Sequence, residues 1–91
     1  MEQTPHADFT KRYEELNDVS KMILNKILEV LTREMDLKTD DLIAEFGDSV
    51  GRDGVKQHVE MLKKKGFIRE TFDGVIGAIP GAKEWFRSQS K

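Results

Sequence analysis

Basic side chains gather in one stretch of the sequence, GRDGVKQHVEMLKKKGFIR, residues 51–69. This stretch has six Lys and Arg residues and two acidic residues, a net charge of +4, whereas the rest of the chain has nine basic and fifteen acidic residues, a net charge of −6. Cationic side chains grouped on one element attract anions and donate charge-assisted hydrogen bonds to them. These basic residues could therefore bind an anionic surface. The alternative is a helix whose basic face is simply solvated.

The basic stretch has the periodicity of an amphipathic helix. Its apolar residues recur at helical spacing, at Val55, Val59 and Leu62. They predict a helix from residue 51 or 52 to residue 65, and Gly66 can adopt the positive φ that ends a helix. With the apolar stripe turned inward, the side chains that point away are those of Arg52, Asp53, Lys56, Gln57 and Glu60. His58 lies on the flank of the stripe, where we expect a partly buried packing residue.

Two helices are predicted before the basic one. Residues 18–35 have a broad apolar arc that indicates burial on more than one side, so this should be the central helix. A short second helix follows in the sequence KTDDLIAEFG, with Thr39 as its cap, two aspartates in its positive first turn and Gly47 after its last turn. The basic helix would therefore pack against two others.

The remaining elements flank this three-helix set. Asp73-Gly74 is a dipeptide preferred in two-residue hairpin turns, and it lies between two short apolar runs. This turn would pair Phe72 with Val75. Two short helices are predicted at the ends: an opening one with Phe9, Tyr13 and Leu16 on one face, and a closing one, AKEWFRSQ, that brings Trp85 and Phe86 to the domain.

Composition excludes several kinds of chemistry. The chain has no cysteine and only two histidines, which rules out thiolate metal sites, cysteine nucleophiles and a histidine-rich metal site. It contains no glycine-rich phosphate loop, and its serines have no His and acid constellation to activate them. We therefore expect no enzymatic activity, no metal and no cofactor. With no apolar run near the about 20 residues that span a bilayer, we also expect a cytoplasmic protein without a membrane partner.

The sequence GDSVGRDGVKQHVEMLKKKGFI, residues 47–68, resembles the core of winged helix-turn-helix domains of the small bacterial and archaeal transcriptional regulator type. In that family a short second helix ends at a glycine, and the third helix carries V-x-x-x-[LV]-x-x-L-x-x-x-G-[LF]-[IV], a pattern that this chain matches without a gap from Val55 to Ile68. The resemblance covers about residues 19–87. It implies a mainly α fold with a small β-hairpin (α+β): a three-helix core, a wing and short terminal helices.

The resemblance also implies partners and site residues. The third helix, residues 51–65, would be the recognition helix in the major groove of double-stranded DNA, with base edges nearest to Arg52, Asp53, Lys56 and Gln57. Phosphates would lie near Lys63, Lys64 and Arg69. An alternative for the lysines 63–65 is purely structural, because cations in the last turn complement the negative end of a helix dipole.

The predicted wing departs from the DNA-reading pattern. Its tip, residues 71–75, is apolar and acidic, whereas wings that contact DNA carry basic residues. Phe72, Val75 and Trp85 instead predict a surface for another protein or for a second copy of the chain. The alternatives are that Phe72 folds back onto its own domain, and that the terminal helices cap their own core rather than build a homodimer interface.

We therefore predict one domain over residues 18–87, with an N-terminal extension over residues 1–17 that includes a short helix, and a tail over residues 88–91. The predicted function is sequence-specific DNA binding by a small transcriptional regulator, with both a homodimer and a single copy left open. The alternative function is a winged-helix protein-interaction module that uses the apolar wing tip and the acidic second helix.

Overall fold

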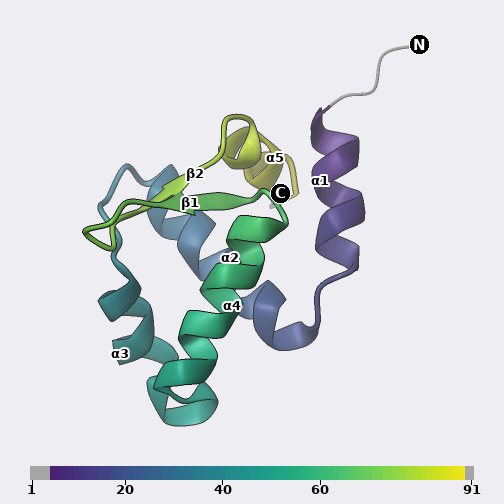
Figure 1. Cartoon of the computed structure of the whole chain (residues 1–91). Coiled ribbons are helices and arrows are strands. Elements are labelled where there is room, and N and C mark those ends of the chain that lie inside the picture. Colours follow the sequence, from purple (N-terminus) through teal and green to yellow (C-terminus); the bar gives the residue numbers. More distant parts are fainter. Residues whose placement is uncertain (1–4, 90–91) are drawn as a thin grey trace.

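Five helices and one antiparallel hairpin surround a single core in the computed structural model, which describes residues 5–89 and the side chains of residues 8–89 (Figure 1). Residues 90 and 91 of the predicted tail, and the side chain of His6, lie outside the described part. No helix within it is long and apolar enough to cross a membrane. The prediction of a mainly helical α+β fold with a hairpin after the helices is confirmed.

The helix α2, Asp18–Thr32, contributes more buried residues to the core than any other described helix. The Asn17 side chain caps it by accepting a hydrogen bond from the Ser20 N–H at 2.8 Å. Four consecutive inward positions, Ile23, Leu24, Ile27 and Leu28, are fully buried. The helix ends earlier than predicted, because Glu34 adopts a φ of 60° and leaves Met35 outside it, 58% exposed.

The helices α3, Thr39–Val50, and α4, Arg52–Lys64, are joined by the single residue Gly51. The prediction that Gly47 ends α3 is wrong, because the positive φ that ends a helix occurs at Gly51, where φ is 90°. The two helices pack closely near this corner. A Cβ added to Gly54 would lie only 2.9 Å from the Cγ1 of Val50, so Gly54 permits the close approach of α3 to α4.

The hairpin consists of β1, Ile68–Glu70, and β2, Ile76–Ala78, with Arg69 opposite Gly77. The predicted pairing of Phe72 with Val75 is wrong, because the loop has three residues instead of two. The Gly74 N–H bonds to the Thr71 carbonyl, and the Thr71 N–H to the Val75 carbonyl, each at 2.9 Å. This arrangement requires a positive φ at Gly74 alone, at 85°, and spares Asp73 that strained conformation.

The segment between α2 and α3 lies beside strand β2 and forms one further backbone pairing with the hairpin. Lys38 forms an isolated antiparallel bridge with Val75. On either side of it, the Ile76 N–H donates to the Leu37 carbonyl at 2.8 Å and the Thr39 N–H donates to the Gly74 carbonyl at 3.0 Å. These bonds fix the base of the hairpin loop to the start of α3.

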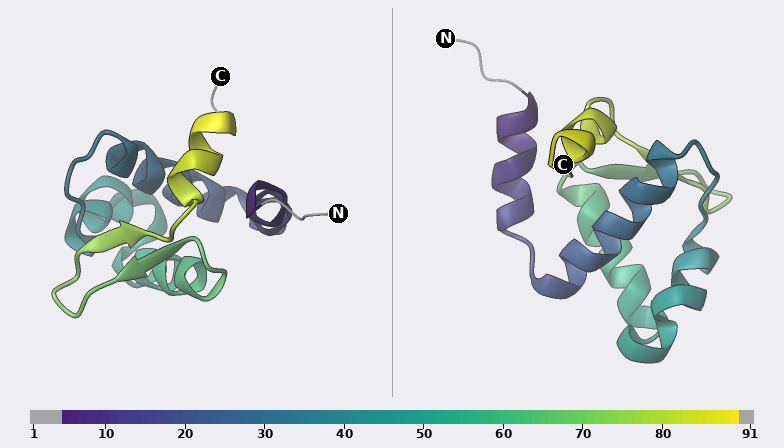
Figure 2. Two further views of the ribbon diagram at one scale, coloured as in Figure 1. Left: turned by 90° about the horizontal axis from the view of Figure 1, so that it is seen from above. Right: turned by 180° about the vertical axis from the view of Figure 1, so that it is seen from behind.

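The terminal helices α1, Pro5–Glu14, and α5, Ala82–Gln89, lie side by side and close the core (Figure 2). The Trp85 ring is 2% exposed and packs against Phe9, Tyr13 and Phe67 at centroid distances of 5.3 to 6.0 Å. Its indole N–H donates to the Thr10 hydroxyl at 2.9 Å. The predicted extension therefore contributes to the same core as the rest of the chain, and nearly all of the Trp85 surface is buried in this core.

Candidate nucleic-acid interface

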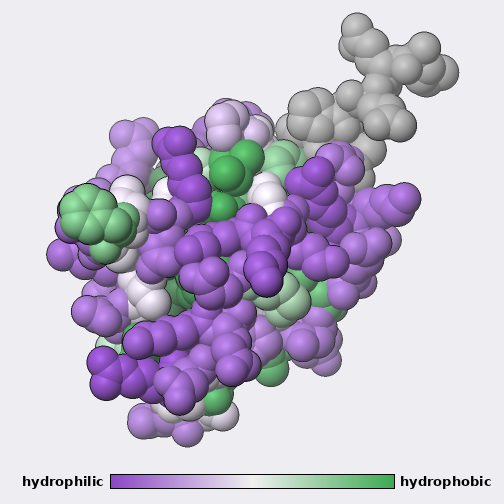
Figure 3. Space-filling model, in the orientation of Figure 1, coloured by the Kyte–Doolittle hydropathy of each residue, from purple (hydrophilic) through white to green (hydrophobic). Residues whose placement is uncertain are grey.

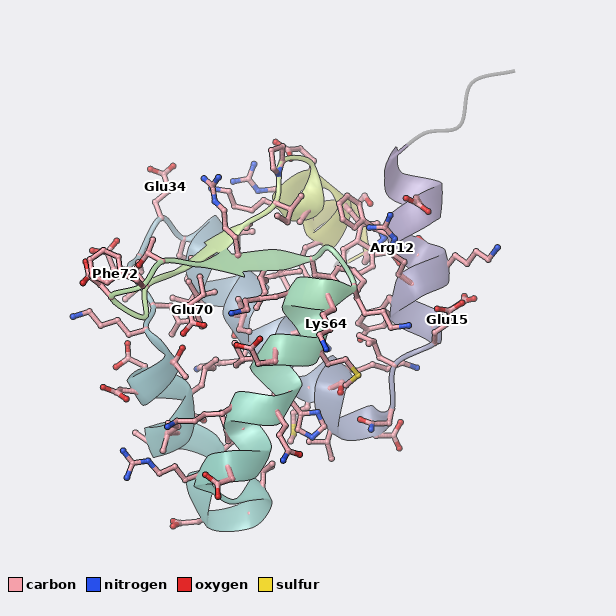
Figure 4. The ribbon with its side chains drawn as sticks, viewed as in Figure 1. Arg12, Glu15, Glu34, Lys64, Glu70 and Phe72 are labelled. Atoms are coloured by element: carbon pink, nitrogen blue, oxygen red, sulfur yellow. The ribbon has the colours of Figure 1, made fainter. Side chains whose placement is uncertain are left out.

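The helix α4 presents a polar face to solvent because its apolar face is fixed in the core. Val55, Val59 and Leu62 are at most 1% exposed, which sets the rotation of the helix about its axis. The opposite side chains are all exposed, namely Arg52, Asp53, Lys56, Gln57, Glu60 and Lys64. We call these six residues the α4 strip; Figure 4 shows Lys64 projecting from α4 toward the viewer.

The strip has more positive than negative charge that is free to bind. Within the described residues, no ion pair involves Arg52, Lys56 or Lys64, whereas the carboxylate of Glu60 is held by Lys63 at 2.8 Å. A shallow hollow of about 420 Å³ lies along the strip and is lined in part by Lys56, Gln57 and Lys64. The structure therefore brings together the predicted base-contacting residues and one predicted phosphate-contacting lysine.

Lys63, also predicted at phosphates, is neutralised inside the chain. Its ammonium lies 2.8 Å from a carboxylate oxygen of Glu60 and 3.1 Å from one of Glu70. These two hydrogen bonds, Glu60 first and then Glu70, raise the pKa of Lys63 above its ordinary value. The ammonium stays charged, but the two carboxylates beside it give this cluster a net negative charge that disfavours a phosphate, so the structure favours the structural alternative for this lysine.

Glu70 joins three elements through its carboxylate. It accepts a hydrogen bond from the Thr39 hydroxyl at the start of α3, and from Lys63 near the end of α4. The Thr39 hydroxyl is the main cause that lowers the pKa of Glu70, and Lys63 adds to the effect, while partial burial acts in the opposite direction. No local sequence pattern indicates the contact of Glu70 with Thr39, but Glu60 lies three residues before Lys63 on one helix, and this spacing is typical of an ion pair.

Lys65 and Arg69 lie apart from the strip. The ammonium of Lys65 pairs with Glu15 at 3.2 Å, and the guanidinium of Arg12 donates to the Lys65 carbonyl at 3.1 Å, so the end of α4 is tied to the N-terminal region. Arg69 is exposed on β1, and its neighbour Glu70 points toward α4. Because successive strand residues point to opposite faces, Arg69 faces away from α4. Its side chain lies over Gly77, where an added Cβ would be 3.4 Å from its Nε.

The predicted protein-contacting residues are separated by the structure. Phe72 is 100% exposed at the tip of the hairpin, so it does not fold back onto its own domain (Figure 4). Val75 is half-buried at the base of the loop, where it pairs with Lys38. Trp85 lies in the core. Of the three, only Phe72 offers a large apolar surface.

The other polar groups in the core have structural explanations. Ser20 is fully buried, and its hydroxyl lies 2.7 Å from the Nδ1 of the half-buried His58. This hydrogen bond links α2 to α4 and satisfies both groups, in agreement with a packing role for His58. Among the residues with described side chains, no group of three or more His, Cys, Asp and Glu side chains is arranged to hold a metal ion.

Comparison with known proteins adds no relative to this description. The chain matches no family model, and no curated protein or solved structure is significantly similar to it. The fold and the surface thus define a class only: a small, mostly helical domain with a two-stranded hairpin after its fourth described helix and a polar, partly cationic helix face beside it.

Proposed function

We propose that the chain binds double-stranded DNA sequence-specifically, as a small winged-helix transcriptional regulator with α4 in the major groove. The support from the fold is the element order: α2, a short pairing at Lys38, α3, α4 and then the hairpin. This order is compatible with a winged helix-turn-helix domain in which α4 is the recognition helix and the hairpin is the wing. With 13 residues, α4 is about 20 Å long, and the major groove admits an α-helix.

One observation carries the proposal: Arg52, Lys56 and Gln57 are exposed at the N-terminal half of α4 and unpaired within the described part of the chain. Arg or Lys can donate to O6 and N7 of guanine, and Gln can pair with N6 and N7 of adenine. Asp53 can accept from N4 of cytosine. Lys64, two turns further along, would contact a phosphate and contribute affinity without sequence information.

A charge-reversal experiment tests this function. The double variant Arg52→Glu, Lys56→Glu should bind a fluorescently labelled random-sequence duplex pool at least about 30-fold more weakly than wild type, because each lost base or phosphate contact costs about 1–3 kcal/mol. The matched control is Lys11→Glu, Arg87→Glu, which changes the net charge equally on α1 and α5, where both side chains are exposed. The control should retain most of its affinity.

Two results would contradict the proposal. One is an unchanged duplex affinity in the α4 variant, with the fold verified by circular dichroism. The other is an equal loss of affinity in the α4 variant and the control, since binding would then follow net charge alone and not the α4 strip.

A protein-interaction module remains the second candidate function, and two observations favour it. The exposed Phe72 gives the wing tip an apolar contact, and α3 carries four exposed carboxylates, at Asp40, Asp41, Glu45 and Asp48. Salt separates the two candidates. DNA binding through phosphate contacts weakens steeply as salt rises, whereas a contact centred on an apolar side chain does not.

A further inference from the structure

Phe72 is a fixed apolar projection and not a side chain on a loose loop. Backbone hydrogen bonds close the three-residue loop that carries it, and the Thr71 hydroxyl accepts a further bond from the Val75 N–H at 3.2 Å. The loop is in turn attached to the start of α3 through Thr39 and Gly74. The aromatic ring of Phe72 is nevertheless entirely in solvent. Figure 3 shows an isolated hydrophobic group at the left edge of a face that is otherwise mostly hydrophilic.

An apolar groove occupies another part of the surface. It runs between α1, α2, α3 and α5, has a volume of about 630 Å³, and is lined mainly by Tyr13, Met22, Phe46, Trp85 and Phe86. Met22 is 45% exposed there, although it belongs to the central helix. Aromatic rings and a methionine side chain form a suitable environment for another aromatic ring.

The groove and the hairpin tip also have complementary charges. Lys26 lines the groove, and the Lys21 ammonium lies 5.4 Å from the centre of the Tyr13 ring at its edge. Glu29, the acidic residue in the lining, pairs with Arg33 at 3.2 Å. The rim therefore presents positive charge. At the hairpin tip, the exposed carboxylate of Asp73 follows Phe72 directly and has no ion pair within the described residues.

We propose that the Phe72 side chain of one copy of the chain inserts into the Tyr13–Met22–Phe46–Phe86 groove of a second copy, with Asp73 beside the lysines of the groove rim. The hairpin tip and the terminal helices that border the groove lie at opposite sides of the molecule (Figures 1 and 2), so a copy cannot fill its own groove. Because the two contacting surfaces lie at opposite sides of the molecule, two copies cannot make the contact reciprocally, so it is heterologous and joins copies head to tail. The contact between copies requires no DNA. An experiment without DNA can therefore refute this contact and leave the proposed DNA-binding function untouched.

Two complementary variants test this contact in the absence of DNA. Phe72→Ala removes the projection and keeps the groove, whereas Met22→Glu places a charge in the groove and keeps the projection. In sedimentation velocity runs over a range of concentrations, wild type should self-associate. Each variant alone should associate at least about 30-fold more weakly, as expected for an anchor residue in a pocket.

Mixing the two variants gives the decisive result. Each retains the surface that the other lacks, so an equimolar mixture should form dimers and nothing larger. Met22 is partly exposed, and circular dichroism checks that Met22→Glu still folds. The proposal is overturned if wild type is monomeric throughout, if Phe72→Ala associates like wild type, or if the mixture stays monomeric. A Phe72→Ala variant that loses duplex affinity without any change in sedimentation would equally overturn it, because Phe72 would then contact DNA.

Discussion

Replacing Phe9 by Ala should destabilise the whole domain, although Phe9 precedes the domain boundary that the sequence suggests. The ring is 5% exposed and lies 5.7 Å from the ring centre of Phe67 and 6.0 Å from that of Trp85. Removing a buried phenyl group of this kind costs about 3–5 kcal/mol, whereas a domain of this length has a free energy of unfolding of about 5–14 kcal/mol. About a fifth or more of the stability should be lost, and the melting temperature should fall by at least about 12 °C.

Thermal and guanidinium unfolding, followed by Trp85 fluorescence, measures this loss directly. Trp85 is the only tryptophan of the chain and lies in contact with Phe9, so its emission reports on this cluster. The matched control is Lys11→Ala, an exposed position on the same helix, which should change stability by no more than about 0.5 kcal/mol. A Phe9→Ala protein that unfolds within about 3 °C of wild type would refute the reasoning and make α1 a dispensable extension.

Three other predictions follow from single contacts. Glu34→Gly should raise the free energy of unfolding by about 0.5–1 kcal/mol, since Glu34 has a φ of 60°. Gly66→Ala should lower the free energy of unfolding by about 1–2 kcal/mol, because φ there is 84° and the new Cβ would lie 2.6 Å from a guanidinium nitrogen of Arg12. Thermal unfolding measures both changes. Hydrogen bonding lowers the pKa of Glu70, so its contribution to stability is present above the ordinary value of 4.5 and is lost as the pH falls through the lowered value. Melting temperatures measured against pH should therefore fall less steeply on acidification in Glu70→Gln than in wild type; parallel curves would contradict this. Finally, Lys64→Ala should reduce the slope of log K against log salt for duplex binding by about 0.9, whereas Lys63→Ala, whose ammonium is already paired within the chain, should leave it nearly unchanged.

The helices could be predicted from the sequence because apolar periodicity fixes which side of a helix is buried. The stripe of Val55, Val59 and Leu62 gave both the extent of α4 and its exposed face. Helix ends were less predictable, since Gly47 and Gly51 are both glycines and only packing decides which adopts a positive φ. In the structure α3 continues past Gly47 and ends at Gly51, close to its contact with α4.

The hairpin register shows a similar limit. Asp73-Gly74 satisfies the sequence preference of a two-residue turn and of a three-residue loop alike. The three-residue loop leaves only Gly74 at positive φ, and the bridge between Lys38 and Val75 holds this arrangement. That bridge joins residues far apart in the sequence, so no local pattern could reveal it.

For the candidate interface, the sequence predicts only the features that depend on a single helix, namely which side chains of α4 are exposed. The exposure of Arg52, Lys56 and Gln57 follows from the helical period and agrees with the structure. The state of Lys63 does not follow from it, because Glu70 reaches this lysine from the hairpin and is oriented by Thr39. Burial of Trp85 likewise depends on α1, a helix at the other end of the chain.

An NMR titration of the ¹⁵N-labelled chain with a random-sequence duplex would locate the DNA-binding surface residue by residue. If α4 is the recognition helix, amide shifts should concentrate at residues 51–57 and around Lys64, with smaller changes at the terminal helices. Shifts confined to the terminal helices or to the hairpin tip, with the N-terminal half of α4 unaffected, would contradict this role of α4.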